Sequence, residues 1–319
     1  MSSNYQGKRV ARTRRTLLLF VVVAAVLALT AAFLVYQKFW RHGPVTSDQP
    51  PGSGAVQSGS ASAPLPPQQP DVPKLPETPP YDFSQPVPEG EPVDNSYFDD
   101  AAFVGDSRTD GFMLYSGIGT GDNLSANGVS IFKLADRKSL VIDGEKYTAL
   151  EALALKRYGK VYIALGINEL GYNNDEGFYQ SYCGAIDEIR RIQPNAVIYI
   201  QGLIPVNESQ AASSTGKDYF KNDHLRTYND LMRQAAEEKQ VVYLDVYSEF
   251  VDENGALPED ASRDGVHLYK ESCQRWLAYL KTHTVDFDTL YPDGPPAVAE
   301  PEPKPAEPDV STMDGSGQE

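Results

Sequence analysis

Residues 161–168 read Val-Tyr-Ile-Ala-Leu-Gly-Ile-Asn, so that five apolar residues in a row are followed by a glycine and, two positions later, a polar amide. An uninterrupted apolar run of this length is typical of a strand that is buried on both faces, as in parallel sheets. Residues 100–104 form a similar short run, and the polar sequence Gly-Asp-Ser-Arg-Thr follows it. Each stretch therefore predicts a buried strand that ends at a polar turn.

Helical and strand patterns alternate along the rest of this region. A helix is expected to begin near Ser107. The remaining expected elements are strands at 126–132, 196–203 and 241–246 and helices at 147–158, 176–192, 220–238 and 270–281. Such alternation predicts an α/β fold, a doubly wound parallel β-sheet with flanking helices and right-handed crossovers. In sheets of this kind, the polar groups that follow the strands meet at one edge.

Charge and proline are distributed unevenly along the 319 residues, whose formal net charge is −16. Residues 1–42 carry seven Lys and Arg and no acidic residue, whereas the remainder is acidic. Nucleic-acid binding is not expected, because phosphate contacts need a basic face on the folded part. Pro-rich polar segments do not pack. The sequence therefore predicts one folded domain at 96–284, between a Pro/Ser/Gly-rich stem at 37–95 and an acidic, Pro-rich, disordered tail at 285–319.

Residues 16–36 contain no charge and consist mostly of Leu, Val, Ala and Phe. As a helix, a segment of this length spans a hydrocarbon core of about 30 Å. The basic end, residues 1–15, precedes it, and only Lys38 and Arg41 follow closely, so the positive-inside rule places the N-terminus in the cytoplasm. We expect a single-pass transmembrane helix acting as a signal anchor in the cell membrane, with the domain extracytoplasmic. A cleaved signal peptide is the alternative.

Cys183 and Cys273 are the only cysteines. A location outside the cell would permit a disulfide. Both residues, however, share a helical stripe with apolar neighbours, so two buried free thiols are the favoured expectation. Neither cysteine is paired with another ligand at the spacing of a metal site.

Three separated segments carry the residue types of nucleophilic catalysis. Ser107 and Asn168 each follow a predicted strand, and Asp264 and His267 lie in the loop after the last one. A serine hydroxyl needs a base to take its proton, the base needs an orienting partner, and the oxyanion that forms needs preset donors. The segments supply a candidate for each role, and the predicted topology brings them to one edge of the sheet.

Each segment also has a purely structural interpretation. Residues 107–110 fit the S-x-x-D capping box, so Ser107 could serve only to cap a helix. Asp264 and His267 could belong to an ordinary surface turn. The remaining histidines are poorer candidates for a base, because they are expected in the stem, at a helix surface or near the end of the domain: His42, His224 and His283.

In this order, the segments resemble the sequence blocks of the SGNH (GDSL-type) hydrolase family, over residues 96–284. Gly105-Asp106-Ser107, Gly166-Ile167-Asn168-Glu169 and Asp264 to His267 match three blocks, and Gly128 matches the glycine of a fourth. The resemblance implies a flavodoxin-like SGNH hydrolase fold. It also implies that Ser107, Asp264 and His267 are catalytic and that Ser107, Gly128 and Asn168 form the oxyanion hole, with no metal or cofactor.

Two residues depart from the family pattern. Arg108 replaces the usual leucine after the serine, and Glu169 replaces the usual aspartate after Asn168. Arg108 could bind an anionic substrate, although pairing with an acid such as Asp110 is the favoured interpretation. Tyr172, near the predicted rim, could stack on a sugar, and ordinary packing is favoured there too.

The expected function is a serine esterase that removes acyl groups, above all acetyl, from a cell-surface or extracellular carbohydrate. An acylated polysaccharide or a peptidoglycan-type polymer would be its substrate, because an esterase on a stem outside a membrane meets surface polymers. Two alternatives stay open. One is an O-acyltransferase that passes the same acyl-enzyme to a sugar acceptor, and the other is a non-catalytic surface binding module.

Overall fold

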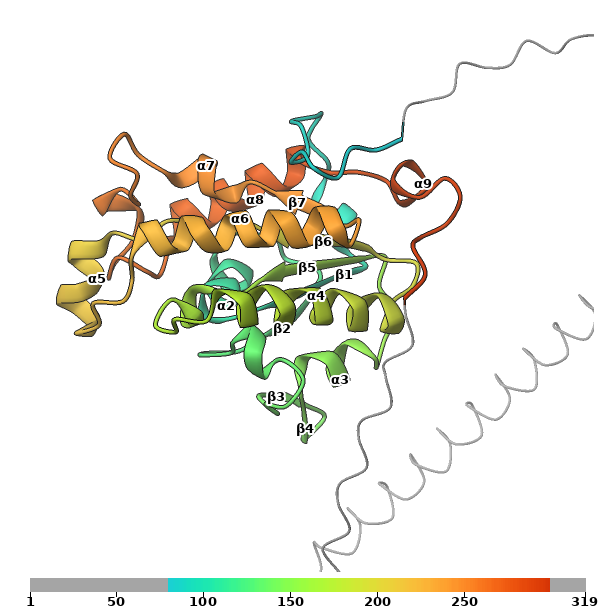
Figure 1. Cartoon of the computed structure of the whole chain (residues 1–319), viewed down its shortest axis with the longest axis horizontal. Coiled ribbons are helices and arrows are strands. Elements are labelled where there is room, and N and C mark those ends of the chain that lie inside the picture. The colour runs from blue at the N-terminus through green and yellow to red at the C-terminus, as the bar shows by residue number, and fades with distance from the viewer. Residues whose placement is uncertain (1–79, 299–319) are drawn as a thin grey trace, which may run out of the picture. The chain divides into compact units, whose positions relative to one another are not determined.

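The computed structural model describes residues 80–298 (Figure 1). The predicted basic end and membrane anchor lie outside these residues, as do the greater part of the predicted stem and the last part of the predicted tail. Within the described range, no helix combines the length and the apolarity that crossing a bilayer requires.

Five strands form one sheet in which every neighbouring pair is parallel. In the order in which they lie side by side, they are β2 (Asp122–Ser125), β1 (Ala101–Gly105), β5 (Lys160–Ala164), β6 (Val197–Gln201) and β7 (Val242–Leu244). This finding confirms the predicted α/β fold with a parallel sheet. The strand order is the one found in flavodoxin-like folds.

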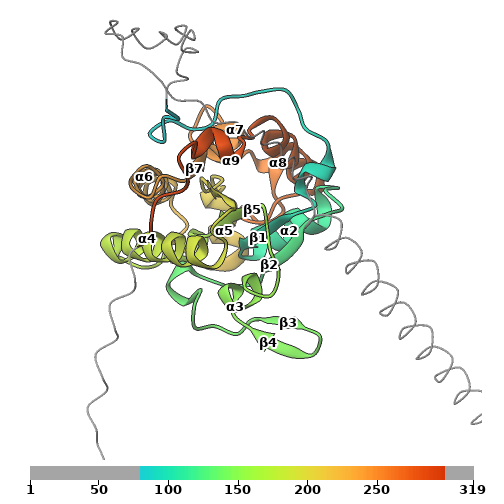
Figure 2. The same cartoon turned by 90° about the vertical axis from the view of Figure 1, so that its right-hand side faces the viewer.

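Helices cover both faces of the sheet (Figures 1 and 2). One face carries α3 (Ala149–Leu153), α4 (Asp175–Ile192) and α6 (Asn222–Glu238), and the other carries α2 (Ser107–Tyr115), α7 (Val246–Phe250) and α8 (Lys270–Thr282). Successive strand residues point to opposite faces, so Ala102 and Val104 join the first core cluster, whereas Ala101 and Phe103 join the second. Burial on both faces explains why these strands are apolar throughout.

Three aromatic side chains stand in register across the middle of the sheet. Phe103 lies opposite Tyr162, and Tyr162 lies opposite Tyr199. The first two rings stack with centroids 4.9 Å apart, and the second pair stacks at 4.5 Å. Cross-strand aromatic pairs of this kind stabilise a sheet by roughly 0.2–1 kcal/mol each, so this row fixes the register of β1, β5 and β6.

The second strand is not where the sequence predicted it. Residues 126–132 were expected to form a strand, but β2 ends at Ser125, and a turn and the short 3₁₀ helix η2 (Ile131–Lys133) follow. β2 lies at the edge of the sheet and is only partly buried, so its sequence Asp-Asn-Leu-Ser is largely polar. The apolar Val129 and Ile131 are buried from the turn and from η2.

Several short elements have no counterpart in the sequence prediction. They are η1 (Asn95–Phe98), β3 (Leu140–Ile142), β4 (Glu145–Tyr147), η3 (Ile167–Glu169), α5 (Glu208–Thr215), α7, η4 (Glu259–Ala261) and α9 (Phe287–Leu290). β3 and β4 form an antiparallel hairpin through Asp143 and Gly144, both at positive φ. An Asp-Gly pair is a strong hairpin signal, so this element was detectable from the sequence.

The folded unit extends beyond the predicted limits of 96–284 at both ends. A strap, residues 80–94, runs along the domain, and its backbone N–H groups at Val87, Gly90 and Val93 donate to the carbonyls of Tyr243, Thr282 and Lys281. After residue 284, α9 buries Leu290 and Tyr291. Proline content alone therefore set the boundaries too narrowly, because short extended segments can still pair with a completed fold.

Both cysteines are buried free thiols, as the sequence favoured. Cys183 lies on α4 and Cys273 on α8. Burial raises the pKa of Cys273 to about 11, so its thiol stays protonated at neutral pH.

Candidate active site

Ser107 lies where β1 ends and α2 begins, at the carboxyl edge of the sheet. The residue that caps the helix is Asp106, whose side chain accepts the Arg108 N–H at 2.8 Å. The structure therefore rejects the interpretation of Ser107 as the cap, and its hydroxyl is available for another partner. Gly105 is required for space, since a Cβ there would lie 1.9 Å from Thr109 Oγ1 on the first turn of α2.

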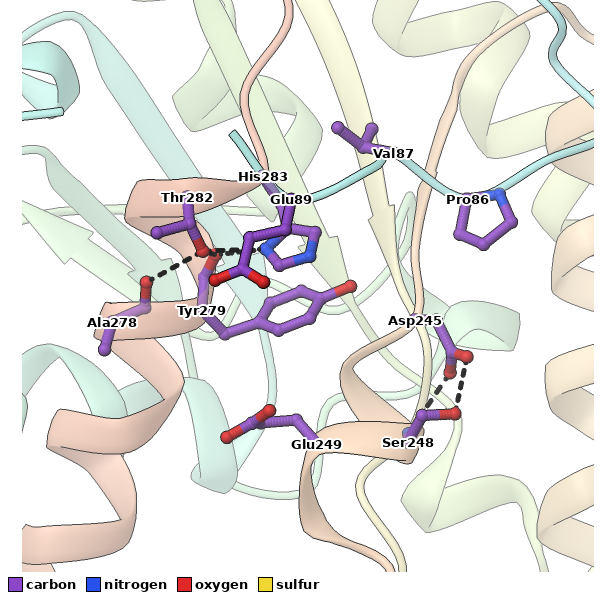
Figure 3. Close-up of a pocket in the computed structure, with 10 residues that line it drawn as sticks. All are labelled: Pro86, Val87, Glu89, Asp245, Ser248, Glu249, Ala278, Tyr279, Thr282 and His283. Carbon is purple, nitrogen blue, oxygen red and sulfur yellow. Dashed lines mark hydrogen bonds between the residues drawn. The ribbon is translucent and has the colours of Figure 1, made fainter. Parts of the chain in front are cut away.

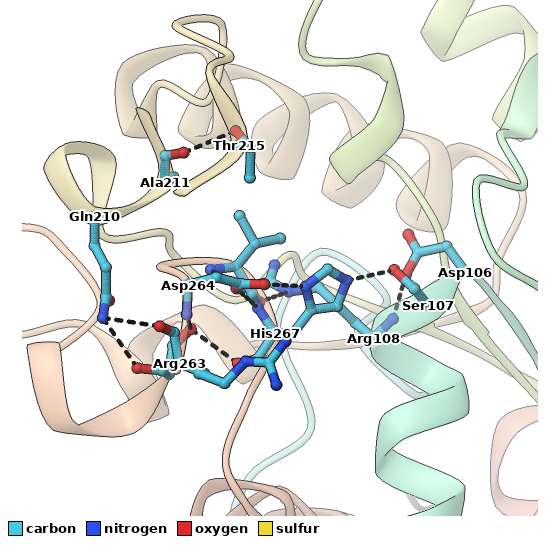
Figure 4. Close-up of polar contacts among 11 residues, drawn as sticks. Asp106, Ser107, Arg108, Gln210, Ala211, Thr215, Arg263, Asp264 and His267 are labelled. Carbon is cyan, nitrogen blue, oxygen red and sulfur yellow. Dashed lines mark hydrogen bonds and ion pairs between the residues drawn. The ribbon is translucent and has the colours of Figure 1, made fainter. Parts of the chain in front are cut away.

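Ser107, His267 and Asp264 form one chain of hydrogen bonds (Figure 4). Ser107 Oγ lies 2.9 Å from His267 Nε2, and His267 Nδ1 lies 2.8 Å from Asp264 Oδ2. These contacts bring together residues that are 160 positions apart in the sequence. The arrangement has the nucleophile, base and orienting carboxylate of a serine acyl-transfer site.

Asp264 and His267 belong to the histidine loop, residues 262–268. Asp264 Oδ1 accepts the backbone N–H of Val266 at 3.0 Å and of His267 at 2.8 Å. Partial burial acts to raise the pKa of Asp264, but these two bonds and the imidazole outweigh it and lower the pKa below its usual value. The carboxylate is therefore ionised at neutral pH and can stabilise an imidazolium.

The turn of the histidine loop depends on Gly265, which has a φ of 82°. A side chain at this position would be strained by the backbone conformation. It would also collide with the chain before and within α5, because its Cβ would lie 2.5 Å from both Asn207 O and Ala211 N. The glycine thus lets the loop pack closely against α5.

Arg108 fastens the histidine loop to the sheet edge and does not face solvent. Its guanidinium donates to the carbonyls of Val266, Ile204 and Pro205 at 2.7–2.9 Å, and the residue is only 6% exposed. Burial lowers the pKa of Arg108 to about 10, which leaves it charged at neutral pH. The expected pairing with Asp110 is wrong, since Asp110 accepts from Asn123.

Of the predicted oxyanion donors, Ser107 begins α2, Gly128 lies on the glycine loop, residues 126–131, and Asn168 lies on η3. Three polar side chains from outside that loop hold its backbone. Arg137 Nη1 donates to Gly128 O at 2.6 Å, Asn168 Nδ2 donates to Val129 O at 2.9 Å, and the Glu169 carboxyl accepts the Ile131 N–H. Asn168 has a second amide N–H that this contact does not use.

Two buried carboxyl groups lie beneath this site. Burial raises the pKa of Glu169 to about 8 and that of Asp106 to about 6, and the negative charge of Asp106 further raises the pKa of Glu169. Within the described part of the chain, Glu169 Oε2 has no hydrogen-bond partner. Glu169 is therefore protonated over much of the neutral pH range. With the proton on Oε2, Oε1 is still free to accept the N–H of Ile131.

Two cavities meet at Ser107 and His267. One, of about 360 Å³, is also lined by Gly128 and Asn168, so the structure brings four of the five predicted catalytic and oxyanion residues, all but Asp264, into a single space. The other, of about 610 Å³, is lined by residues of α2, of the histidine loop and of the start of α8. We name them the oxyanion cavity and the helix cavity.

Tyr172, the aromatic residue expected near the rim, lines neither of these cavities, whereas Tyr115 lines one of them. Tyr115 is 53% exposed on the wall of the helix cavity. Tyr172 is exposed but contacts Phe132 edge to face, and it is not among the residues that line either cavity. Arg108 lines the helix cavity, but its guanidinium bonds to backbone carbonyls, so a substrate-binding role for it or for Tyr172 has no support from the geometry.

A further cavity lies beside the strap and is lined by another serine, histidine and aspartate, namely Ser248, His283 and Asp245 (Figure 3). Here Ser248 bonds to Asp245, while His283 stacks on Tyr279 and its Nδ1 lies 2.8 Å from that residue's backbone oxygen. No hydrogen bond joins Ser248 to His283 in this cavity. His224, likewise, pairs with Asp175 and not with a serine.

Sequence reasoning missed several residues that line the two cavities. They are Asn127, which lines both, and Lys217, Phe220, Arg263, Tyr269 and Lys270. Arg263 and Lys270 lie within four residues of His267 in the sequence, so their proximity could have been inferred. Lys217 and Phe220 come from the segment between α5 and α6, and no local pattern marks them.

Comparison with known proteins agrees with this architecture. Residues 103–275, more than half of the chain, match the GDSL-like lipase/acylhydrolase family. No curated protein matches the chain.

Similar solved structures include a GDSL-like lipase from Bacteroides thetaiotaomicron, which is 16% identical, covers 60% of this chain and 88% of its own, and has a TM-score of 0.45. A structure from Streptococcus pneumonia, described as a candidate platelet activating factor, is 23% identical, with coverage of 57% and 82% and a TM-score of 0.47. A peptidoglycan O-acetylesterase is 19% identical, with coverage of 51% and 45% and a TM-score of 0.39. By its match over residues 103–275, the chain belongs to the GDSL-like lipase/acylhydrolase family.

Proposed function

We propose that this protein is a serine esterase that removes acyl groups, above all acetyl, from a cell-surface or extracellular carbohydrate. The observation that carries the proposal is the hydrogen-bonded chain from Ser107 through His267 to Asp264, which opens into the cavity that contains Asn168. Family membership supplies the class of activity, acyl hydrolysis. The acetylated carbohydrate is the finer part of the proposal.

The first half of the reaction acylates the serine. His267 Nε2 takes the proton of Ser107 as Oγ attacks the ester carbonyl, and Asp264 holds the imidazole in the tautomer with a hydrogen atom on Nδ1. The carbonyl oxygen becomes an oxyanion in the oxyanion cavity, where the N–H groups of Ser107 and Gly128 and the free amide N–H of Asn168 donate to it. The imidazolium then gives its proton to the leaving alcohol.

The second half transfers the acyl group from Ser107 to an acceptor. The imidazole side chain of His267 is 49% exposed, so water reaches the base directly. His267 removes a proton from that water, which attacks the acyl-enzyme; the bond to Ser107 Oγ then breaks, the imidazolium returns the proton to Oγ, and the acid is released. This exposure favours hydrolysis over transfer to a sugar, because a transferase has to exclude water from the acyl-enzyme.

The site and the sequence together support a carbohydrate at a cell surface. Both cavities are open, and two aromatic residues on the rim of the helix cavity, Tyr115 and Tyr269, are exposed and so available to contact a sugar ring. The membrane anchor at 16–36 and the extracytoplasmic location rest on the sequence pattern alone. An anchored esterase with an open site suits a large polymer.

Covalent labelling of the serine tests the proposal. The full-length protein and its Ser107→Ala variant are incubated with a fluorophosphonate probe and, separately, with p-nitrophenyl acetate. Labelling and acetate release by the wild type alone would support the acyl-enzyme, and an acetylated polysaccharide would then be assayed for acetate release. A folded wild type that neither labels nor hydrolyses the ester would refute the proposed mechanism.

A further inference from the structure

The helix cavity combines exposed apolar side chains with exposed positive charge next to the reactive groups. Its rim contains Leu114, Tyr115 and Tyr269, which are 66%, 53% and 42% exposed. Arg263 and Lys270 line the same cavity as Ser107 and His267. These five rim residues come from α2, from the histidine loop with the residue that follows it, and from the first residue of α8.

Neither cation has an acidic partner among residues 80–298. No salt bridge joins Arg263 or Lys270 to a carboxylate of the described chain, although many other exposed lysines and arginines are paired in this way. The two acidic residues of the cavity are already engaged, since Asp110 accepts from Asn123 and Asp264 from His267. The helix cavity therefore holds two positive charges beside the base that no carboxylate of the described chain neutralises by direct contact.

The reaction geometry decides which half of an ester this cavity receives. The carbonyl oxygen has to point toward Gly128 and Asn168, which line the oxyanion cavity and not the helix cavity. The alcohol oxygen has to lie near His267 Nε2, which protonates it. In a carbohydrate acetate the alcohol half is much the larger, and the helix cavity, at about 610 Å³, is the larger space.

We infer that the helix cavity binds the alcohol half of the ester and that this half is an acidic sugar, a ring bearing a carboxylate or a phosphate. The inference rests on the proposed esterase function and specifies its substrate class. Tyr115, Tyr269 and Leu114 contact the face of the ring, and Arg263 and Lys270 attract its anionic group. Arg108 takes no part, because backbone carbonyls occupy its guanidinium.

A series of aryl esters tests the inference on the full-length protein. Phenyl acetate is neutral, 3-acetoxybenzoate carries an anion on the alcohol half, and monophenyl succinate carries an anion on the acyl half. Each kcat/KM is divided by the rate of alkaline hydrolysis of the same ester, which corrects for intrinsic reactivity. We expect the wild type to prefer 3-acetoxybenzoate over phenyl acetate roughly tenfold at low ionic strength, since exposed charge pairs are individually weak, and to lose the preference in high salt.

The double variant Arg263→Ala/Lys270→Ala is expected to lose that preference. The measured quantity is the ratio of kcat/KM for two esters, so a general loss of activity affects both values and does not change the ratio. Lys146→Ala is the matched control, because Lys146 is exposed on β4 and lines neither cavity, and it is expected to keep the preference.

Acetates of glucuronate and of glucose 6-phosphate, each compared with the same acetate of glucose, then distinguish a carboxylate from a phosphate. An unchanged ratio in the double variant, or a preference for monophenyl succinate, would overturn the inference while leaving the esterase proposal intact. Hydrolysis of none of the esters would overturn both.

Discussion

Within the histidine loop, the Asp264 carboxylate accepts backbone N–H groups two and three residues later, and Ser262 Oγ donates to His267 O. Arg108 and Gln210 add side-chain bonds to its carbonyls from distant parts of the sequence. The glycine loop is held in the opposite way, by three side chains that lie outside it: Arg137, Asn168 and Glu169. One loop therefore carries most of its geometry in its own sequence. The other takes its geometry from its neighbours, so the position of Gly128, its proposed oxyanion donor, depends on the position of η3.

This difference predicts two kinds of response to mutation. A change in the histidine loop should remove one chemical role and leave the rest of the site in place. A change at the glycine loop or η3 should weaken transition-state binding and alter local packing together. The predictions that follow test this contrast, beginning with the largest expected effect.

Asp264→Asn should lower kcat by about 10³–10⁴, the scale seen when a triad carboxylate is neutralised. The asparagine oxygen can still accept the N–H groups of Val266 and His267, so the loop keeps its shape, but His267 is then held in the wrong tautomer. Hydrolysis of p-nitrophenyl acetate gives the rate, and an unchanged circular dichroism spectrum is the control for folding. A loss smaller than tenfold would mean that Asp264 does not orient the base.

Asn168→Ala should lower kcat by roughly 10²–10³ with little change in KM, since one oxyanion donor acts only in the transition state. It should also destabilise the protein, because the bond to Val129 O is lost. Steady-state kinetics and thermal unfolding measure the two effects separately. A rise in KM at constant kcat would instead assign Asn168 to substrate binding in the ground state.

Glu169→Gln is expected to have the smallest effect. The effect is a change in how the free energy of unfolding depends on pH. The folded-state pKa of about 8 lies above the unfolded value of 4.5. Between these values the folded state holds a proton that the unfolded state has released, so the free energy of unfolding falls as the pH rises from about 5 to 8. The glutamine mimics the protonated acid and removes this contribution, on the order of 1–4 kcal/mol.

Thermal unfolding at pH 5, 6.5 and 8 checks the Glu169 prediction. The melting temperature of the wild type should decrease more steeply over this range than that of Glu169→Gln. Asp106, whose pKa is raised to about 6 by burial, is present in both proteins and adds the same slope to each at the acidic end. Parallel curves would show that Glu169 is ionised throughout.

The contrast between the loops also explains what could be predicted from the sequence. The buried strands β1, β5 and β6 appear as continuous apolar runs, so their limits were predicted to within one or two residues. Ser107, Asp264 and His267 sit in short local motifs, so their meeting at one edge of the sheet could be predicted, and their hydrogen bonds show it. The strand expected at 126–132 was wrong because its apolar residues are buried from a turn and a 3₁₀ helix. The pattern of apolar residues cannot distinguish a strand from such a turn when distant side chains set the backbone conformation of the segment.

The role of Arg108 was hidden for the same reason. A charged residue beside a nucleophile suggests substrate binding or a nearby acid, and neither interpretation holds. Its three acceptors are backbone carbonyls from two loops about 100 and 160 residues away. Backbone acceptors carry no sequence signature, so only the folded structure reveals such a contact.

The contacts of the strap lie at the opposite end of α8 from the helix cavity. Its hydrogen bonds reach Lys281 and Thr282, at the far end of α8, whereas Lys270, at the start of that helix, lines the helix cavity. A helix of 13 residues is about 20 Å long, and Figure 1 shows the coloured chain beginning and ending on the side of the sheet away from α2. Ser107 lines the same cavity as Lys270 and therefore lies toward the end of α8 that the strap does not contact. A protein immobilised through a tag before residue 80 would therefore keep this cavity open to a polymer as broad as a cell wall.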